Sequence, residues 1–181
     1  LHAHVPPVLP VERVQHRVLD DGQLDDAKRA LFGADAWFRD GWEDLQRLAP
    51  PGRAIAVAQR HALVLLKPDA IAARLLHRSL DWFEDEGAAI VGSAAVQLDR
   101  QSFRAMWQWQ LGASTRDRRD LGDAIVGVGP SLLVILRLPV ASVPATVRVS
   151  ASKGPADPTR RRPGQLRSAL EGADAGPVIV A

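Results

Sequence analysis

The sequence contains no cysteine and no tyrosine among its 181 residues, and only 5% of its residues are aromatic. The lack of cysteine excludes disulfides and thiolate metal sites. The lack of tyrosine removes one common proton donor and one group on which nucleobases stack. No apolar stretch is long enough to span a membrane, and the N-terminal residues show no signal-peptide pattern. We therefore expect a cytoplasmic protein that does not contact a membrane.

The overall composition is that of a soluble globular protein, with 46% hydrophobic and 24% charged residues. A chain of this length holds one domain with a sizeable core and an extension. The net charge of +2 is too small to indicate nucleic-acid binding by itself, although the sequence pI of about 9.6 leaves it open. We consider a nucleic-acid partner unlikely.

The most informative stretch runs from His61 to Leu98. It opens with the apolar run 62–66, which Lys67-Pro68-Asp69 ends, and this pattern predicts a buried strand. Apolar residues then recur at helical spacing between Ile71 and Phe83, with Gly87 as the expected C-cap. A second apolar run, 88–96, predicts another strand.

Three motifs within this stretch resemble the opening of nucleoside diphosphate kinases. They are Lys67-Pro68-Asp69-Ala70, the segment Phe83-Glu84-Asp85-Glu86-Gly87, and Gln97-Leu98 at the end of the second strand. The resemblance extends more loosely toward the C-terminus and covers about two thirds of the chain. It implies a ferredoxin-like α+β fold, binding of ATP or another nucleotide with Mg²⁺, and assembly into a homo-oligomer.

The remaining C-terminal half completes this fold. We expect a helix after Asp99, a buried strand over 131–138, a helix over 140–149, a short helix over 166–170 and a last strand over 178–180. The resulting order is βαββαβ, with a four-stranded antiparallel sheet and helices on one face. The charged stretch 112–123 between them reads as a solvated loop or helix face, or alternatively as a rim that attracts phosphates.

The first 60 residues predict an N-terminal helical extension and linker, followed by the kinase-like domain at 61–181. Two helices are expected within 26–48, and Ala49-Pro50-Pro51-Gly52 is expected to form the linker. We expect the aromatic cluster Trp37, Phe38 and Trp42 to pack on the kinase-like domain or across a dimer, rather than to bind another partner. His2 and His4 lie in an extended arm, where such a pair is more often incidental than a metal site.

The resemblance assigns phosphate-binding roles to several cationic residues. Lys67 matches the family's strand-end lysine, while Arg148 and Arg167 resemble its two arginines. Lys153 stands where the family has a nucleotide-binding threonine, and an added cation is compatible with anion binding. Each of these residues also has a simpler interpretation, because a lysine can cap a sheet end and a loop arginine is usually solvated. We do not predict a metal site made by the protein.

The sequence departs from the family at the catalytic position. The resemblance implies a nucleophilic histidine about a dozen residues after Arg167, but no histidine follows Arg167. Either Val180 replaces that histidine or the histidine lies beyond Ala181, so the catalytic residue is unknown. The aromatic residue expected near 118–119 to stack on the base is also missing, and His77 is expected on a helix surface.

Three hypotheses follow from this sequence. The first is a diverged nucleoside-diphosphate-kinase-like domain that binds nucleotide or another phosphate ligand and lacks phosphohistidine activity. The second is an active kinase, transferring phosphate from ATP to nucleoside diphosphates, whose nucleophile lies past residue 181. The third is a biosynthetic enzyme that uses the same cleft for other chemistry.

Overall fold

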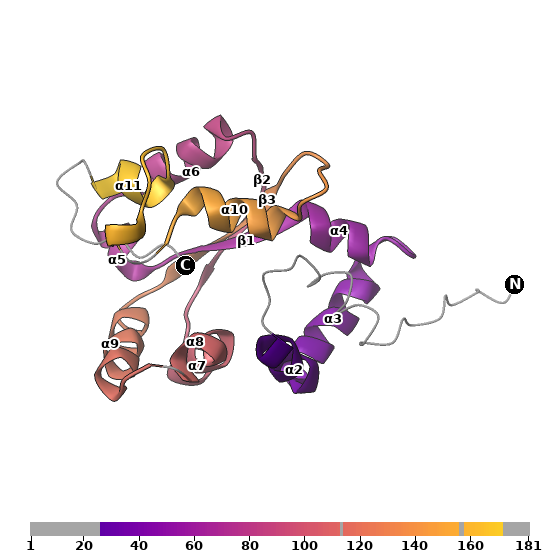
Figure 1. Ribbon diagram of the computed structural model, residues 1–181, viewed down its shortest axis with the longest axis horizontal. Helices are drawn as coiled ribbons and strands as arrows, with labels where there is room; N and C mark the ends of the chain where they lie inside the picture. Colours follow the sequence, from indigo (N-terminus) through magenta and orange to yellow (C-terminus); the bar gives the residue numbers. More distant parts are fainter. Residues whose placement is uncertain (1–25, 113, 156–157, 172–181) are drawn as a thin grey trace, which may run out of the picture.

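The core of the protein is an antiparallel sheet with strands β1 (His61–Leu66), β2 (Ala89–Val96) and β3 (Ser131–Arg137) (Figure 1). The computed structural model describes residues 26–112, 114–155 and 158–171. Within them the strand order is β1-β3-β2, and β3 runs antiparallel to both neighbours. The α+β class and the antiparallel sheet are confirmed, while the fourth strand expected at 178–180 lies outside the described residues.

One face of the sheet carries the main hydrophobic core. In β1, Ala62, Val64 and Leu66 are buried, and they pair with Leu136, Val134 and Leu132 of β3. Paired residues of neighbouring strands share a face, so these six side chains point to the same side of the sheet. The opposite face is only partly covered, because Leu63 of β1 exposes 65% of its surface.

The helices α6 (Leu76–Asp85), α10 (Ala145–Lys153) and α11 (Leu166–Glu171) cover the core face. They lie together on one side of the strands in Figure 1. Their buried side chains complete the core, namely Phe83, Ala145, Val149, Leu166 and Leu170. On the other side, α7 (Arg100–Met106), α8 (Gln108–Gly112) and α9 (Arg116–Gly127) connect β2 to β3.

The helix predicted between Ile71 and Phe83 is in fact two helices, α5 (Pro68–Ala72) and α6. The break falls at Arg74, whose backbone is left-handed with a φ of 58°. No glycine or proline occupies this position, so no local residue pattern predicts the break. Gly87 has a φ of 82° and ends α6 as predicted.

Two further boundaries differ from the prediction. The helix expected at 140–149 begins only at Ala145 and continues to Lys153, because Pro144 occupies its N-cap and residues 140–143 are not helical. The charged stretch 112–123, for which a loop or a helix face was expected, contributes most of α9. Thr115 caps this helix by accepting a hydrogen bond from the Arg118 N–H.

From residue 26 onward, three helices precede the sheet: α2 (Asp26–Ala34), α3 (Ala36–Leu48) and α4 (Ala54–Arg60). Two helices were expected before the linker and are present, but α4 was not expected. Trp42 is buried in a small cluster with Ala54 at the α3–α4 junction. Trp37 is 75% exposed, so it does not pack on the domain, and its packing across a dimer stays a prediction. The expected arm at 1–12 lies outside the described residues.

None of the described helices combines the length and the apolar character that a membrane crossing would need. The division of the chain at residue 60 stays a prediction, since α4 ends at Arg60 and β1 begins directly at His61.

Candidate phosphate-binding site

Lys67 lies directly after β1, where Pro68 begins the short helix α5. Only 7% of its surface is exposed. Its ammonium lies 4.7 Å from the centre of the Trp107 ring and 6.0 Å from the centre of the Phe103 ring. Burial lowers the pKa of Lys67, nearby Asp69 raises it, and Arg167 lowers it further. The aromatic rings and Asp69 therefore offset part of the cost of burying this charge.

Arg167 reaches the same region from the first turn of α11. It is 6% exposed, and its Nη1 donates a hydrogen bond to the Gly154 carbonyl over 2.7 Å. Burial lowers the pKa of this guanidinium, and the charge of Arg161 lowers it further. Arg161 itself is half-buried and donates from Nε to the Pro155 carbonyl over 3.1 Å.

Lys153 is the last residue of α10 and completes the cluster. Burial, followed by the charges of Arg167 and Lys67, lowers the pKa of Lys153 to about 8. In the described part of the chain, no hydrogen bond or ion pair joins the ammonium of Lys153 or of Lys67 to another residue. We call Lys67, Lys153 and Arg167 the cation cluster.

Contacts between the end of α10 and the start of α11 bring Lys153 and Arg167 together. Gly154 has a φ of 84°, and a Cβ at this position would lie 2.7 Å from Oε1 of Gln165. Gln165 donates from Nε2 to the Ala151 carbonyl and accepts a hydrogen bond from the Arg162 N–H. A glycine is therefore required here both by the backbone conformation and by the close approach of Gln165.

The structure does not bring Arg148 into this cluster. Its Nη1 donates to the Pro139 carbonyl over 3.0 Å. Pro139 follows Leu138, whose N–H bonds to the Arg60 carbonyl at the start of β1, whereas Lys67 lies at the end of β1. The six residues of β1 separate the two positions by about 20 Å. Of the four residues proposed from sequence, three meet and Arg148 lies at the opposite end of the sheet.

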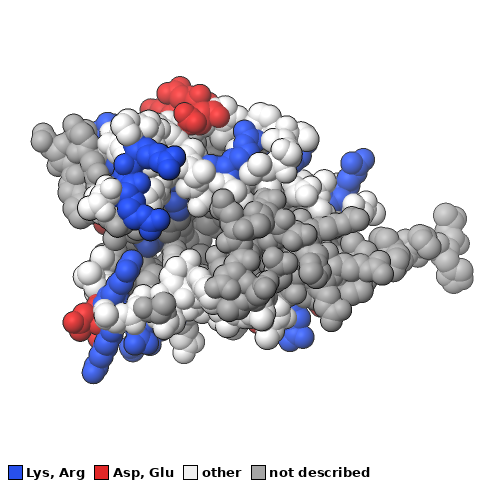
Figure 2. Space-filling view, viewed as in Figure 1, with Lys and Arg blue, Asp and Glu red and all other residues white. Residues whose placement is uncertain are grey.

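Exposed arginines surround the cluster. Figure 2 shows Lys and Arg side chains gathered over the end of the molecule where α9 and α11 lie, on both sides of a hollow. The exposed members are Arg116, Arg118 and Arg119 of α9, and Arg160 and Arg162 before α11. This arrangement favours the interpretation of the charged stretch 112–123 as a rim, although Asp117 and Asp120 interrupt it.

Sequence reasoning missed two residues that belong to the site. They are Trp107, whose ring lies beside the Lys67 ammonium, and Arg161, whose charge lowers the pKa of Arg167. Nothing in the sequence places Trp107 beside Lys67, because 40 positions separate them. The three consecutive arginines at 160–162 were a usable signal for positive charge near Arg167.

The described histidines lie outside the cluster. His77 is exposed on α6, as expected. His61 begins β1, at the end away from Lys67, and its Nδ1 lies 2.7 Å from the Val57 carbonyl. No group of three or more His, Asp or Glu side chains in the described ranges could hold a metal ion.

An antiparallel sheet with its core-side helices, preceded by a helical extension, defines a ferredoxin-like α+β protein with buried cations at one end of its sheet. The sequence model of the nucleoside diphosphate kinase family matches residues 60–175, which is more than half of the chain. The chain belongs to the nucleoside diphosphate kinase family. A search of curated proteins finds no match.

Solved structures of nucleoside diphosphate kinases share this fold. Those from Aquifex aeolicus, Borrelia burgdorferi and Encephalitozoon cuniculi are similar to this chain with TM-scores of 0.51, 0.52 and 0.53. Their sequence identities to it are 22%, 14% and 20%. Each comparison covers 67% of this chain and 83%, 77% and 78% of the respective kinase. At these identities the likeness establishes the fold.

Proposed function

We propose that this domain binds the phosphate groups of a nucleotide through Lys67, Lys153 and Arg167. The observation that carries this proposal is the meeting of three cations from β1, α10 and α11 at one end of the sheet. One of the structures similar to this chain, the Borrelia burgdorferi kinase, contains bound vanadate and ADP. Sites that bind phosphoryl groups work mainly by positioning them and neutralising their charge.

The electrostatics of the cluster favour an anionic ligand. Burial and repulsion from Arg167 and Lys67 both lower the pKa of Lys153. The protonated amine therefore destabilises the folded protein. A bound phosphate would offset that cost, because it adds opposite charge and accepts hydrogen bonds from both ammonium groups. Arg167 would contribute a guanidinium, which suits phosphate oxygens.

The phosphate chain is expected to contribute more to binding than the base. The exposed face of α9 beside the cluster carries arginines and has no aromatic residue. Of the two rings nearest Lys67, Phe103 is buried, and Trp107 packs on Phe103 with ring centres 4.9 Å apart. A nucleobase would therefore find little aromatic surface in the described part of the site on which to stack.

Magnesium would accompany the nucleotide, as the family resemblance implies. The cluster supplies ammonium and guanidinium groups, which are not metal ligands, and Asp69 is the carboxylate that interacts with Lys67. Oxygen atoms of the phosphates are the natural ligands for Mg²⁺ in such a site. We place no protein ligand on the ion.

We also propose that the domain has lost phosphohistidine chemistry and acts by binding. Lysine and arginine stabilise transferred charge, but neither His61 nor His77 lies in the cluster to accept a phosphoryl group. The second candidate is an active kinase that uses a histidine outside the described residues. Incubation with labelled ATP and magnesium separates them, since only the second predicts an acid-labile phosphoenzyme.

Calorimetric titration with ATP and magnesium tests the proposed binding. Lys67→Met keeps the length of the side chain and removes its charge, and we expect it to weaken binding by about 1.5–3 kcal/mol. Arg148→Met is the matched control, because its guanidinium lies at the other end of the sheet, and should leave the affinity unchanged. Equal affinities for wild type and Lys67→Met would exclude the cluster as the phosphate site.

A homo-oligomer is the assembly that the family resemblance implies, and we propose it here. Light scattering of the full chain at several concentrations would measure the mass. A monomeric mass at every concentration would contradict this proposal.

A further inference from the structure

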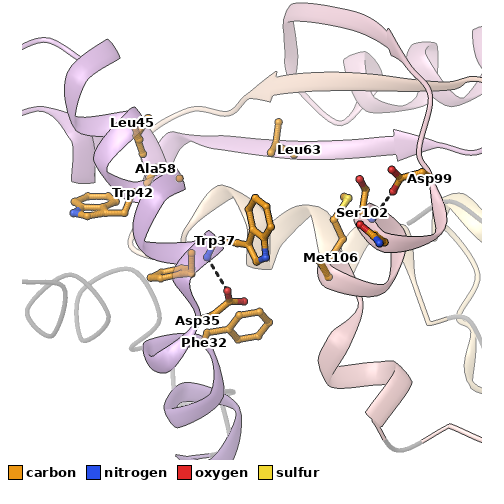
Figure 3. A pocket seen from close by; sticks show the side chains of 14 residues that line it. Phe32, Asp35, Trp37, Trp42, Leu45, Ala58, Leu63, Asp99, Ser102 and Met106 are labelled. Atoms are coloured by element: carbon orange, nitrogen blue, oxygen red, sulfur yellow. Dashed lines mark hydrogen bonds between the residues drawn. The ribbon is translucent and has the colours of Figure 1, made fainter.

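A pocket that is separate from the cation cluster lies between the N-terminal helices and the kinase-like domain. Its volume is about 1060 Å³, and α2, α3, α4, β1 and α7 all contribute to its lining. None of its lining residues belongs to the cation cluster. Leu63 of β1 forms part of it from the face of the sheet opposite the main core (Figure 3). Its size is that of a binding site for a small molecule.

The pocket is lined mainly by apolar and aromatic side chains. Phe32, Trp37, Phe38 and Trp42 come from the extension, and Met106 comes from α7. Trp37 is 75% exposed, Leu63 65% and Met106 50%. Figure 3 shows these three exposed side chains, from three different elements, arranged around the same space. Large apolar groups gathered in one concave place, rather than scattered over the surface, indicate a binding surface.

The charged residues that line the pocket are all acidic. Asp35 and Asp99 both line the pocket, and no Lys, Arg or His is among its described lining residues. This contrasts with the whole chain, which has 23 Lys and Arg against 21 Asp and Glu. In Figure 3 the Asp35 carboxylate lies between the rings of Trp37 and Phe32, while Asp99 lies across the pocket beside α7.

Both carboxylates are fixed in place because each caps a helix. Asp35 accepts a hydrogen bond from the Trp37 N–H over 2.8 Å and another from the Gln108 side chain. Asp99 accepts one from the Ser102 N–H over 2.7 Å. That bond lowers the pKa of Asp99, so the group is ionised at neutral pH. An ionised carboxylate can accept about four hydrogen bonds, so each keeps capacity for a ligand.

We propose that this pocket binds a small apolar molecule that carries an ammonium group. The aromatic rings offer faces to a cation, and the two carboxylates offer the opposite charge. A neutral apolar ligand would bury the carboxylates without adding a partner, and an anionic ligand would be repelled. The apolar lining would hold the hydrocarbon part of the ligand. This site is independent of the phosphate site, and either can exist without the other.

A matched series of probes tests the proposal on the full chain. Octylammonium, octanol and octanoate share one hydrocarbon chain and differ in charge. We expect calorimetry to give octylammonium an affinity at least about tenfold higher than that of either other probe. Equal affinities for the three probes, or tighter binding of octanoate, would overturn the proposal.

Two variants and one control variant distinguish this pocket from other surfaces. Asp35→Asn combined with Asp99→Asn removes both charges and keeps both helix caps, since asparagine caps as well as aspartate does. This variant should keep its melting temperature and lose the preference for octylammonium. Ala105→Phe should fill the pocket and abolish binding, while Val140→Phe, at an exposed position that is not among the lining residues, should bind like wild type. Unchanged preference in the double variant would overturn the assignment of the carboxylates.

A second copy of the chain is the competing occupant. If the apolar surface is an interface between copies, Leu63→Glu should lower the mass measured by light scattering, and octylammonium should not bind. That pair of results would overturn the proposal. ATP titration of the same variants provides a separate readout, and we expect it to match wild type, because the cation cluster shares no residue with the pocket.

Discussion

The ammonium of Lys67 lies 4.7 Å from the centre of the Trp107 ring, although 40 positions separate the two residues in the chain. A buried lysine is costly unless something compensates its charge, and the electron-rich face of this indole does so together with Phe103 and Asp69. The contact joins the end of β1 to the turn between α7 and α8 and so forms one wall of the proposed phosphate site.

Replacement of Trp107 should therefore destabilise the protein through Lys67. We expect Trp107→Leu to lower the free energy of unfolding by about 0.5–2 kcal/mol more than Trp107→Phe, which keeps an aromatic face. Urea denaturation measures both variants. If leucine and phenylalanine cost the same, the ring contributes only apolar volume.

The lowered pKa of Lys153 predicts a particular dependence of stability on pH. The pKa of Lys153 is about 8 in the folded protein, against 10.5 for an unperturbed lysine, so the unfolded state binds more protons between these pH values. The destabilisation is fully present below pH 8 and is relieved as the pH rises toward 10.5. Relative to Lys153→Met, the wild type should gain stability over this range, which thermal denaturation at several pH values measures. If the melting temperatures of the two proteins change in parallel with pH, the pKa of Lys153 is not lowered.

The same residue should link ligand binding to pH. A bound phosphate raises the pKa of Lys153, so binding above pH 8 takes up a proton and the affinity falls as the pH increases. ATP with magnesium is a suitable probe because its phosphates are already fully deprotonated over this range. We expect its affinity for wild type to decrease between pH 7.5 and pH 9.5 by more than the affinity of Lys153→Met does. A change of the same size in both proteins would contradict the linkage.

Gly122 in α9 packs directly on Phe103, whereas Gly127 in the same helix has open space around it. Alanine should therefore destabilise the protein at Gly122 but not at Gly127. A Cβ on Gly122 would lie 2.8 Å from Cζ of Phe103, whereas one on Gly127 would meet nothing within 4 Å. Gly122→Ala should cost about 1–3 kcal/mol through overpacking. Gly127→Ala should be neutral or stabilising by up to about 1 kcal/mol, because alanine favours helix. Thermal denaturation compares the two, and stabilisation by both would contradict the close contact.

Asp123 joins α9 to α7, since it accepts hydrogen bonds from Arg104 over 2.7 Å and from Arg100 over 2.9 Å. The Arg104 hydrogen bonds hold the pKa of Asp123 below its usual value of 3.8. The stabilisation is therefore present above about that pH and is lost as the pH falls through the folded value. Asp123→Asn should lower the melting temperature at pH 7 and have a smaller effect at pH 3. An equal effect at both pH values would show that the ion pairs do not contribute.

The sequence predicted the three described strands and the position of Lys67 at the end of β1, because their signals are local. An apolar run that ends at Pro68 marks both the end of β1 and the lysine beside it. Arg148 was assigned to the site from its likeness to a family motif, but the direction of its side chain depends on the carbonyl of Pro139. Helix α4 has seven residues, and no side chain caps its start, so its sequence carries no boundary signal. The pocket depends on how α3 approaches α7, which no local pattern records.

Helix α10 contacts α4 of the extension and ends in Lys153. A single rigid element of about 13 Å therefore connects the N-terminal helices to the phosphate site. A structural change at one end of α10 can therefore displace the other end. A truncation that removes α4 and weakens phosphate binding would thus report a loss of support for α10, and would not by itself locate the ligand near the extension.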